Sequence, residues 1–134
     1  MVPVHPFERL VQLRSELERV WDARTSTDPD GWCPGNPARG QCTVAVLLVQ
    51  DEFGGRILRG LVGGLSHFWN ELPDGREVDL TRDQFGVWSV DDVEERTREY
   101  VLATTREDGV ITCDRYAEVV GRLVALRSER VSVT

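Results

Sequence analysis

The residues of this 134-residue chain that could do chemistry are a cysteine, a histidine and an aspartate in three separate contexts. Cys42 stands in RGQCTVAVLLVQ (39–50), directly before an apolar run, whereas His67 lies in SHFWN and Asp79 in EVDLT. A cysteine nucleophile needs a lowered thiol pKa, a base within hydrogen-bonding distance and a third group that orients the base. Cys42, His67 and Asp79 are therefore candidates for the nucleophile, the base and the orienting acid.

The behaviour of the thiol depends on the element that holds it. The apolar residues 44–49 predict a buried helix from about residue 40 to residue 52, although their β-branched side chains would also permit a strand. In the helix, Cys42 would lie in the first turn, where unpaired backbone N–H groups and the helix dipole favour a thiolate. Without its two partners, the same cysteine would be interpreted as a packed core residue, because cysteine is among the most buried residue types.

His67 and Asp79 are predicted to lie on adjacent strands. The turn PDG at 73–75 joins these strands, and cross-strand side chains on one face of such a pair can meet. Counting outward from the turn pairs His67 with about Arg82. We therefore expect a bulge or a wider loop if Asp79 is to lie opposite His67.

The whole sequence predicts one α+β domain over residues 1–134. Segment 24–40 is rich in Pro, Gly, Asp and Asn and predicts a long irregular loop. Short β-rich runs predict a small antiparallel sheet, and two segments after it predict C-terminal helices, the first capped by Ser89. The predicted elements are helices over 6–23, 40–52, 89–104 and 112–130, and strands over 56–64, 65–73 and 76–81.

The charge and the apolar pattern argue against several classes of function. Sixteen basic residues, all arginine, face 23 acidic residues, which gives a net charge of −7 with no basic block, so binding to nucleic acid or to an anionic membrane is not expected. The apolar run 44–49 is too short to cross a bilayer, and the N-terminus lacks the pattern of a secretory signal. We expect a cytoplasmic location in which Cys33, Cys42 and Cys113 are reduced thiols.

The motifs resemble those of two protein families. GQC before an apolar helix, H-x-W-N-E on a strand and V-D-L-T on the next resemble the core of the transglutaminase-like cysteine enzymes. The longer run GQC…SHFWNELPDGREVDLTRDQF resembles more closely the YunG-like family of small bacterial proteins, and this match spans residues 40–85. Thr43 follows the cysteine where transglutaminases usually carry tryptophan, which leaves the substrate preference open.

The resemblance implies a papain/transglutaminase-like α+β fold and an acyl-transfer reaction. In it, Cys42 corresponds to the nucleophile, His67 to the base and Asp79 to the orienting acid of a catalytic triad. The reaction would pass through a thioester intermediate and would need no cofactor and no metal.

The implied reaction also requires two hydrogen-bond donors for the oxyanion, the negatively charged oxygen that forms when the cysteine attacks a carbonyl. The backbone N–H of the cysteine would be one, and one further donor is needed. The candidates are Trp32, Gln41 and Asn36, with Trp32 ranked first because a tryptophan upstream of the cysteine has this role in several transglutaminases. Trp69 is expected in the core or in the wall of the substrate pocket.

The leading interpretation is a cysteine hydrolase acting on the amide or ester bond of a small-molecule, peptide or protein substrate. The alternatives are a non-catalytic module that binds a peptide or metabolite, and an acyltransferase or amide-forming biosynthetic enzyme. Cys33 offers two further pairings, with Cys42 in a redox switch or with His67 in a zinc site, although neither has a recognisable ligand spacing. Cys113 is predicted to be a small buried residue.

Overall fold

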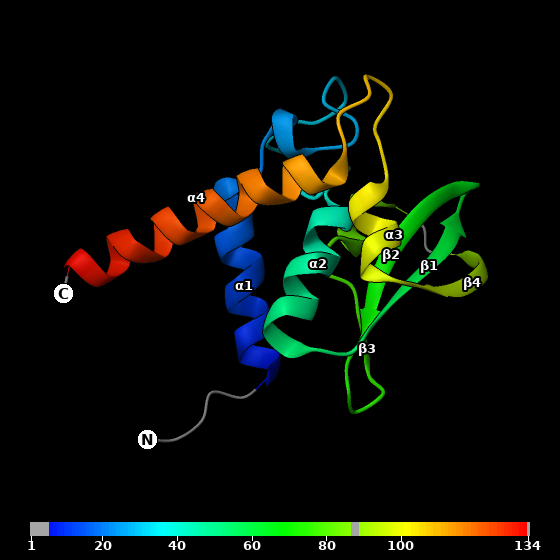
Figure 1. Cartoon of the computed structure of the whole chain (residues 1–134), viewed down its shortest axis with the longest axis horizontal. Helices are drawn as coiled ribbons and strands as arrows, with labels where there is room; N and C mark the ends of the chain where they lie inside the picture. The colour runs from blue at the N-terminus through cyan, green and yellow to red at the C-terminus, as the bar shows by residue number, and fades with distance from the viewer. Residues whose placement is uncertain (1–5, 87–88, 134) are drawn as a thin grey trace.

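Helices cover one face of a small antiparallel sheet in this chain (Figure 1). The computed structural model describes residues 6–86 and 89–133, and within these residues the sheet has four strands in the order β3-β2-β1-β4. This arrangement confirms the predicted α+β class. The helices and strands in chain order are α1 (Pro6–Val20), α2 (Cys42–Phe53), β1 (Arg56–Val62), β2 (Leu65–Glu71), β3 (Glu77–Val78), β4 (Val90–Arg96), α3 (Arg98–Ala103) and α4 (Thr112–Val133).

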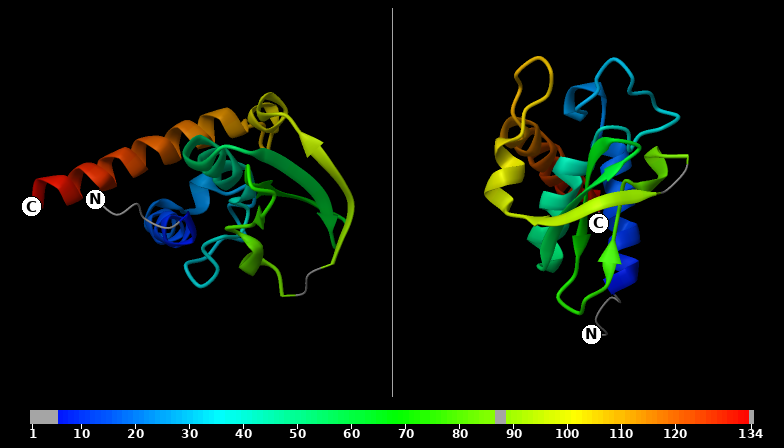
Figure 2. Two further views of the ribbon diagram at one scale, coloured as in Figure 1. Left: turned by 90° about the horizontal axis from the view of Figure 1, so that it is seen from below. Right: turned by 90° about the vertical axis from the view of Figure 1, so that its right-hand side faces the viewer.

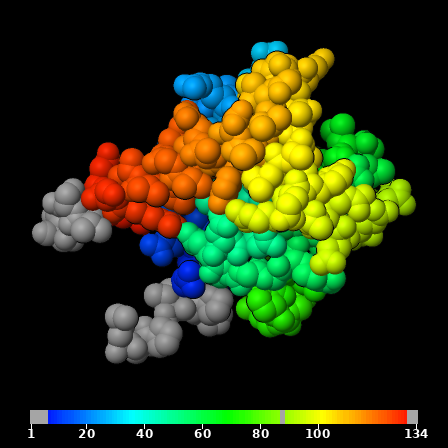
Figure 3. Space-filling model, in the orientation of Figure 1, coloured from blue at the N-terminus to red at the C-terminus, as the bar shows by residue number. Residues whose placement is uncertain are grey.

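The central helix of the core is α2. Residues 44–49 are all buried, as expected for a helix that is apolar on every side, so the helix is confirmed over the strand. One side of α2 packs against α1 and α4 through residues such as Leu17 and Leu123, and the other packs on the sheet through Ile57 and Phe68. Figure 2 shows α2 between the sheet and these two helices, and Figure 3 shows α2 reaching the surface between α3 and the β2–β3 turn.

β1 and β2 form a hairpin closed by Gly63 and Gly64. Both glycines have positive φ angles, 58° and 83°, which a two-residue hairpin turn requires and which glycine adopts without strain. The turn pairs Val62 with Leu65 and so fixes the register of the whole hairpin. In that register Phe68 packs toward α2, and its neighbours along β2 point to the opposite face of the sheet.

The prediction of a helix over residues 89–104 is wrong. Residues 90–96 form the edge strand β4, and α3 begins only at Arg98. A helix over this polar segment would bury little apolar surface, whereas pairing with β1 satisfies the backbone and leaves the acidic side chains exposed on an edge strand. Thr97 rather than Ser89 caps the helix, because its side chain accepts a hydrogen bond from a first-turn N–H.

The predicted loop and the last helix are present, with two differences. Segment 24–40 is irregular except for the single turn η1 (Ala23–Thr25), and the Thr27 N–H donates to the Gly40 carbonyl at 2.9 Å, which ties its ends together. Cys113 is exposed rather than buried. The first turn of α4 instead directs its neighbours Thr112 and Arg115 into the protein.

Candidate functional site

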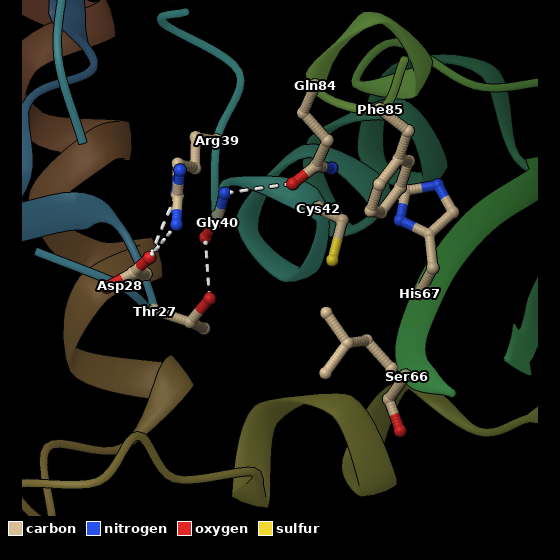
Figure 4. A pocket seen from close by; sticks show the side chains of 10 residues that line it. Thr27, Asp28, Arg39, Gly40, Cys42, Ser66, His67, Gln84 and Phe85 are labelled. Carbon is tan, nitrogen blue, oxygen red and sulfur yellow. Dashed lines mark hydrogen bonds and ion pairs between the residues drawn. The ribbon is translucent and has the colours of Figure 1, made fainter. Parts of the chain in front are cut away.

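Segments distant in the sequence meet at a pocket of about 480 Å³. The pocket is lined by both ends of the 24–40 loop, the N-terminus of α2, the start of β2 and the residues around the end of η2 (Arg82–Gln84). Cys42 and His67 both line it (Figure 4). The pocket thus brings together two of the three residues selected from the sequence, and the third contacts His67 from outside the pocket.

Cys42 is the first residue of α2. The residue is 7% exposed, and Figure 4 shows its sulfur directed into the pocket. In the described part of the chain no side chain caps this helix, because Gln41 at the N-cap position makes no capping hydrogen bond. The first-turn N–H groups and the positive end of the helix dipole therefore remain available to negative charge at this end of α2.

His67 and Asp79 form a hydrogen-bonded pair in which the histidine is buried and the carboxylate is partly exposed. His67 Nε2 lies 2.6 Å from Asp79 Oδ2, and His67 is fully buried. Asp79 Oδ1 accepts a hydrogen bond of 3.0 Å from the Thr81 N–H, which orients the carboxylate. Because Nε2 is directed at Asp79, the ring interacts with Cys42 through its Nδ1 side.

The groups around His67 favour its protonated form. Burial lowers the pKa of His67, but the hydrogen bond to Asp79 and the interaction with Cys42 raise it more, and the resulting pKa is about 9. At neutral pH the ring is therefore an imidazolium held between a carboxylate and a cysteine. In this protonation state a histidine can stabilise a thiolate and later give a proton to a leaving group.

The strand pairing explains how Asp79 reaches His67. Asn70 pairs with Val78, so the same register places Asp79 across from Trp69, and His67 lies two residues further along β2 on the same face. Diagonal neighbours of this kind are within reach of long side chains. The strand β3 ends after two residues, and the chain then turns toward the histidine. A diagonal contact thus takes the place of the bulge or wider loop expected from the sequence.

Two aromatic side chains enclose the His67 ring. Trp69 stacks on it with the ring centroids 5.9 Å apart and the planes at 19°, and Phe85 packs edge-on at 4.9 Å. Trp69 Nε1 donates to Glu77 Oε1 at 2.8 Å. Among the described residues, Phe85 but not Trp69 lines the pocket. Trp69 therefore supports the histidine from behind, away from the space that a substrate would fill.

The side chains predicted as the second oxyanion donor each donate to a backbone carbonyl. The bonds are Trp32 Nε1 to Pro37 O at 2.9 Å, Gln41 Nε2 to Asp22 O at 3.1 Å and Asn36 Nδ2 to Gln84 O at 3.4 Å. None of the three side chains is among the described residues that line the pocket, whereas Gln84 is. Gln84 and Phe85 were not among the predicted site residues, and the one signal for them is the position of TRDQF at the end of the motif run.

Most of the chain matches one protein-family model, which is described as YunG protein and aligns with residues 9–121. The chain belongs to the YunG family. An uncharacterised protein of Bacillus subtilis (strain 168), YunG, is 36% identical over 69 residues. The aligned region is 52% of this chain and 56% of that protein, so the chain spans little more than half the length of this curated relative. No solved structure matches the chain at a significant level.

This YunG-family protein also buries an arginine near the thiol. Arg115 of α4 is 3% exposed and donates to Thr25 O at 2.8 Å, Thr112 Oγ1 at 2.9 Å and Thr43 Oγ1 at 3.2 Å. Among the described residues it forms no ion pair. Burial lowers the pKa of Arg115 to about 10, and negative charge at Cys42 opposes this decrease. The guanidinium is therefore a fixed positive charge beside the first turn of α2 at neutral pH.

Metal-ligating side chains do not gather in the described part of this YunG-family protein. Within residues 6–86 and 89–133, no three His, Cys, Asp or Glu side chains lie close enough together to hold a metal ion. Cys33, considered above as a zinc partner of His67, is exposed and is not among the described residues of the pocket. Across the same ranges no helix has both the length and the apolar character needed to cross a membrane.

Proposed function

We propose that this YunG-family protein is a cysteine-dependent acyl-transfer enzyme that hydrolyses amide or ester bonds and has a papain/transglutaminase-like core. The observation that carries the proposal is the 2.6 Å contact between His67 Nε2 and Asp79 Oδ2, with the same ring interacting with Cys42. A cysteine that serves only as core packing has no need of a buried histidine paired with a carboxylate beside it, because burying a group that can carry charge costs free energy. Cys42 at a helix start, His67 on β2 and Asp79 directly after β3 occur in the order implied by the transglutaminase-like resemblance.

The first half of the reaction acylates Cys42. Its thiolate sulfur attacks the carbonyl carbon of the substrate, a C–S bond forms, and the π electron pair of the carbonyl moves onto the oxygen. When this intermediate collapses, the carbonyl re-forms and the bond to the leaving group breaks. The leaving amine or alcohol takes its proton from the Nδ1 side of His67, and a thioester remains on Cys42.

The second half releases the acyl group. The neutral His67 takes a proton from water, the water oxygen attacks the thioester carbonyl, and the C–S bond breaks to give a carboxylic acid and the Cys42 thiolate. His67 keeps the proton and is again an imidazolium. Asp79 holds the ring in the required tautomer and stabilises its cation throughout.

The pocket limits what can reach the sulfur. Its volume of about 480 Å³ suits a small molecule or one acyl-bearing side chain of a peptide. Exposed Leu65 offers apolar contact at one side, and an ion pair of 2.7 Å between Arg39 and Asp28 forms part of the other. We therefore propose an uncharged acyl group of modest size as the substrate, because both charges of the ion pair are already neutralised.

The proposal is tested by trapping the acyl-enzyme with p-nitrophenyl acetate, a small activated ester. A Cys33→Ser/Cys113→Ser background removes the two exposed thiols and leaves Cys42 as the only cysteine. We expect rapid release of one p-nitrophenolate per chain and an acetyl thioester that peptide mapping places on Cys42. His67→Ala in the same background should slow acylation by about 10² or more, because the group that activates the Cys42 thiolate is lost.

The fate of the thioester adds a second readout. Continued p-nitrophenolate release in water alone shows hydrolysis, and a thioester that persists until an amine is added shows transfer to an amine. Both results support acyl transfer. In the second case the acceptor of the acyl group is an amine instead of water. Slow acetylation that is equal in the two proteins, or acetylation at sites other than Cys42, contradicts the proposal and favours a binding module.

A further inference from the structure

The side-chain amide of Gln84 lies in the wall of the pocket that holds Cys42 and His67. Its Oε1 accepts a hydrogen bond of 3.0 Å from the Gly40 N–H. Its Nε2 is buried and, within the described part of the chain, has no hydrogen-bond partner. Leaving a buried amide N–H without an acceptor is unfavourable, so its presence at a pocket wall points to an acceptor that arrives from outside the chain.

The orientation of this amide is fixed by its neighbours. The group that faces it at Gly40 is an N–H donor, so only the oxygen of the amide can lie there and the nitrogen must point the other way. Figure 4 shows that nitrogen on the side of the pocket where α2 begins. The backbone of Gln84 is held as well, because its N–H donates to Thr81 O at 3.1 Å and its carbonyl accepts from Asn36 Nδ2.

The other candidate donors form hydrogen bonds within the fold. The indole N–H of Trp32 and one N–H each of the Gln41 and Asn36 amides donate to backbone carbonyls, and none of these three side chains is among the described residues that line the pocket. The first turn of α2, in contrast, has no side-chain cap, and the N–H of its first residue has no acceptor within the helix. Two kinds of donor therefore remain at this wall of the pocket, the backbone N–H at the start of α2 and the buried Gln84 amide nitrogen.

We propose that Gln84 Nε2 is the side-chain donor of the oxyanion hole, acting together with the backbone N–H of Cys42. The inference rests on the proposed acyl-transfer function and adds a catalytic residue to it. As the C–S bond forms, the carbonyl π electron pair becomes negative charge on oxygen, and the two N–H groups donate hydrogen bonds to that charge. Gln84 gives up no proton. Its contribution is a donor already aimed at the place where charge develops.

The test compares two electrophiles that react with the same sulfur. Iodoacetamide is attacked at a saturated carbon and loses iodide, so no oxyanion forms, whereas p-nitrophenyl acetate passes through a tetrahedral oxyanion. The ratio of the acylation rate to the alkylation rate therefore reports the oxyanion donor and cancels changes in the reactivity of the thiolate. Both rates are measured in the Cys33→Ser/Cys113→Ser background, so that Cys42 is the only thiol.

Two substitutions at Gln84 separate the donor from the bond to Gly40. Gln84→Met removes both, and Gln84→Glu keeps an acceptor for the Gly40 N–H while replacing the donor by an oxygen. We expect the rate ratio to fall about a hundredfold in both variants while alkylation of Cys42 persists. Gln50→Met is the matched control at the other end of α2, where Gln50 Nε2 donates to Gly55 O, and it should leave the ratio unchanged.

The remaining outcomes all count against the proposal and are distinguishable. An unchanged ratio in both Gln84 variants excludes Gln84 as a donor. Equal loss of acylation and alkylation shows that Gln84 only holds the loop around Cys42, since a structural role slows both reactions together. Failure of the unsubstituted protein to acylate at all overturns the proposed function itself, and that result is read from the parent protein before any Gln84 variant is compared.

Discussion

His67 should make the stability of the fold depend on pH in a defined direction. Its pKa is about 9 in the folded chain, whereas the ordinary value of 6.5 applies to the unfolded chain. A group whose pKa is raised by folding stabilises the fold fully below pH 6.5, and the stabilisation is lost as the pH rises through about 9. At about 1.36 kcal/mol for each pH unit between the two values, the loss is about 3 kcal/mol.

The assay is urea unfolding at a series of pH values between about 6 and 10, in the Cys33→Ser/Cys113→Ser background, compared with the same protein carrying His67→Gln. Glutamine keeps a donor for Asp79 but does not titrate. The difference in unfolding free energy between the two proteins should shrink by about 3 kcal/mol as the pH rises from about 6 to about 10. A difference that stays constant, or that grows with pH, would refute the assignment of a protonated histidine between Asp79 and Cys42.

Two further predictions concern residues outside the triad. Arg115→Met should slow iodoacetamide alkylation of Cys42 at neutral pH by about tenfold, because a buried positive charge near the thiolate is lost. Arg115→Lys should retain most of the alkylation rate. Arg98→Met removes an arginine that donates to Leu47 O, farther along α2, and should not change the rate. Equal slowing in the two methionine variants would contradict the electrostatic role of Arg115. Gly55→Ala and Gly75→Ala should both lower the unfolding free energy by about 1–2 kcal/mol, because their φ angles are 87° and 90°. In urea unfolding, Gly55→Ala should lower the unfolding free energy by about 1–3 kcal/mol more than Gly75→Ala does. The added Cβ at Gly55 would clash with Glu71 O, whereas nothing lies within 4 Å of a Cβ at Gly75. Equal losses in the two variants would show that the contact with Glu71 relaxes.

The residues that carry the proposed chemistry could be selected from the sequence because each stands in a local context of its own. Cys42 stands directly before an apolar run, and the segments SHFWN and EVDLT, which hold His67 and Asp79, flank a recognisable turn. Their exact contact could not be counted from that turn, because Asp79 reaches the histidine diagonally after β3 ends. A register shift of one residue is invisible in the turn sequence and changes which side chains face each other.

Properties that depend on distant segments were not accessible from the sequence. The edge strand β4 exists because β1 offers it a partner, and its own acidic residues resemble the start of a helix. Arg115 lies on an amphipathic helix, and its burial depends on the Thr25 carbonyl 90 positions earlier. Gln84 could be recognised as a donor only after the carbonyls that accept from Trp32 and Asn36 were known.

The central claim, that Cys42 is activated by His67, is tested most directly by the pH dependence of iodoacetamide alkylation. The measurement uses the Cys33→Ser/Cys113→Ser protein with and without His67→Ala, and peptide mapping confirms that Cys42 is the residue modified. A thiolate–imidazolium pair predicts alkylation that remains fast well below the free-thiol pKa of about 8.5 and that becomes slow there in the His67→Ala variant. Slow alkylation at neutral pH with the same pH profile in both proteins would contradict the claim and leave Cys42 as a packed core residue.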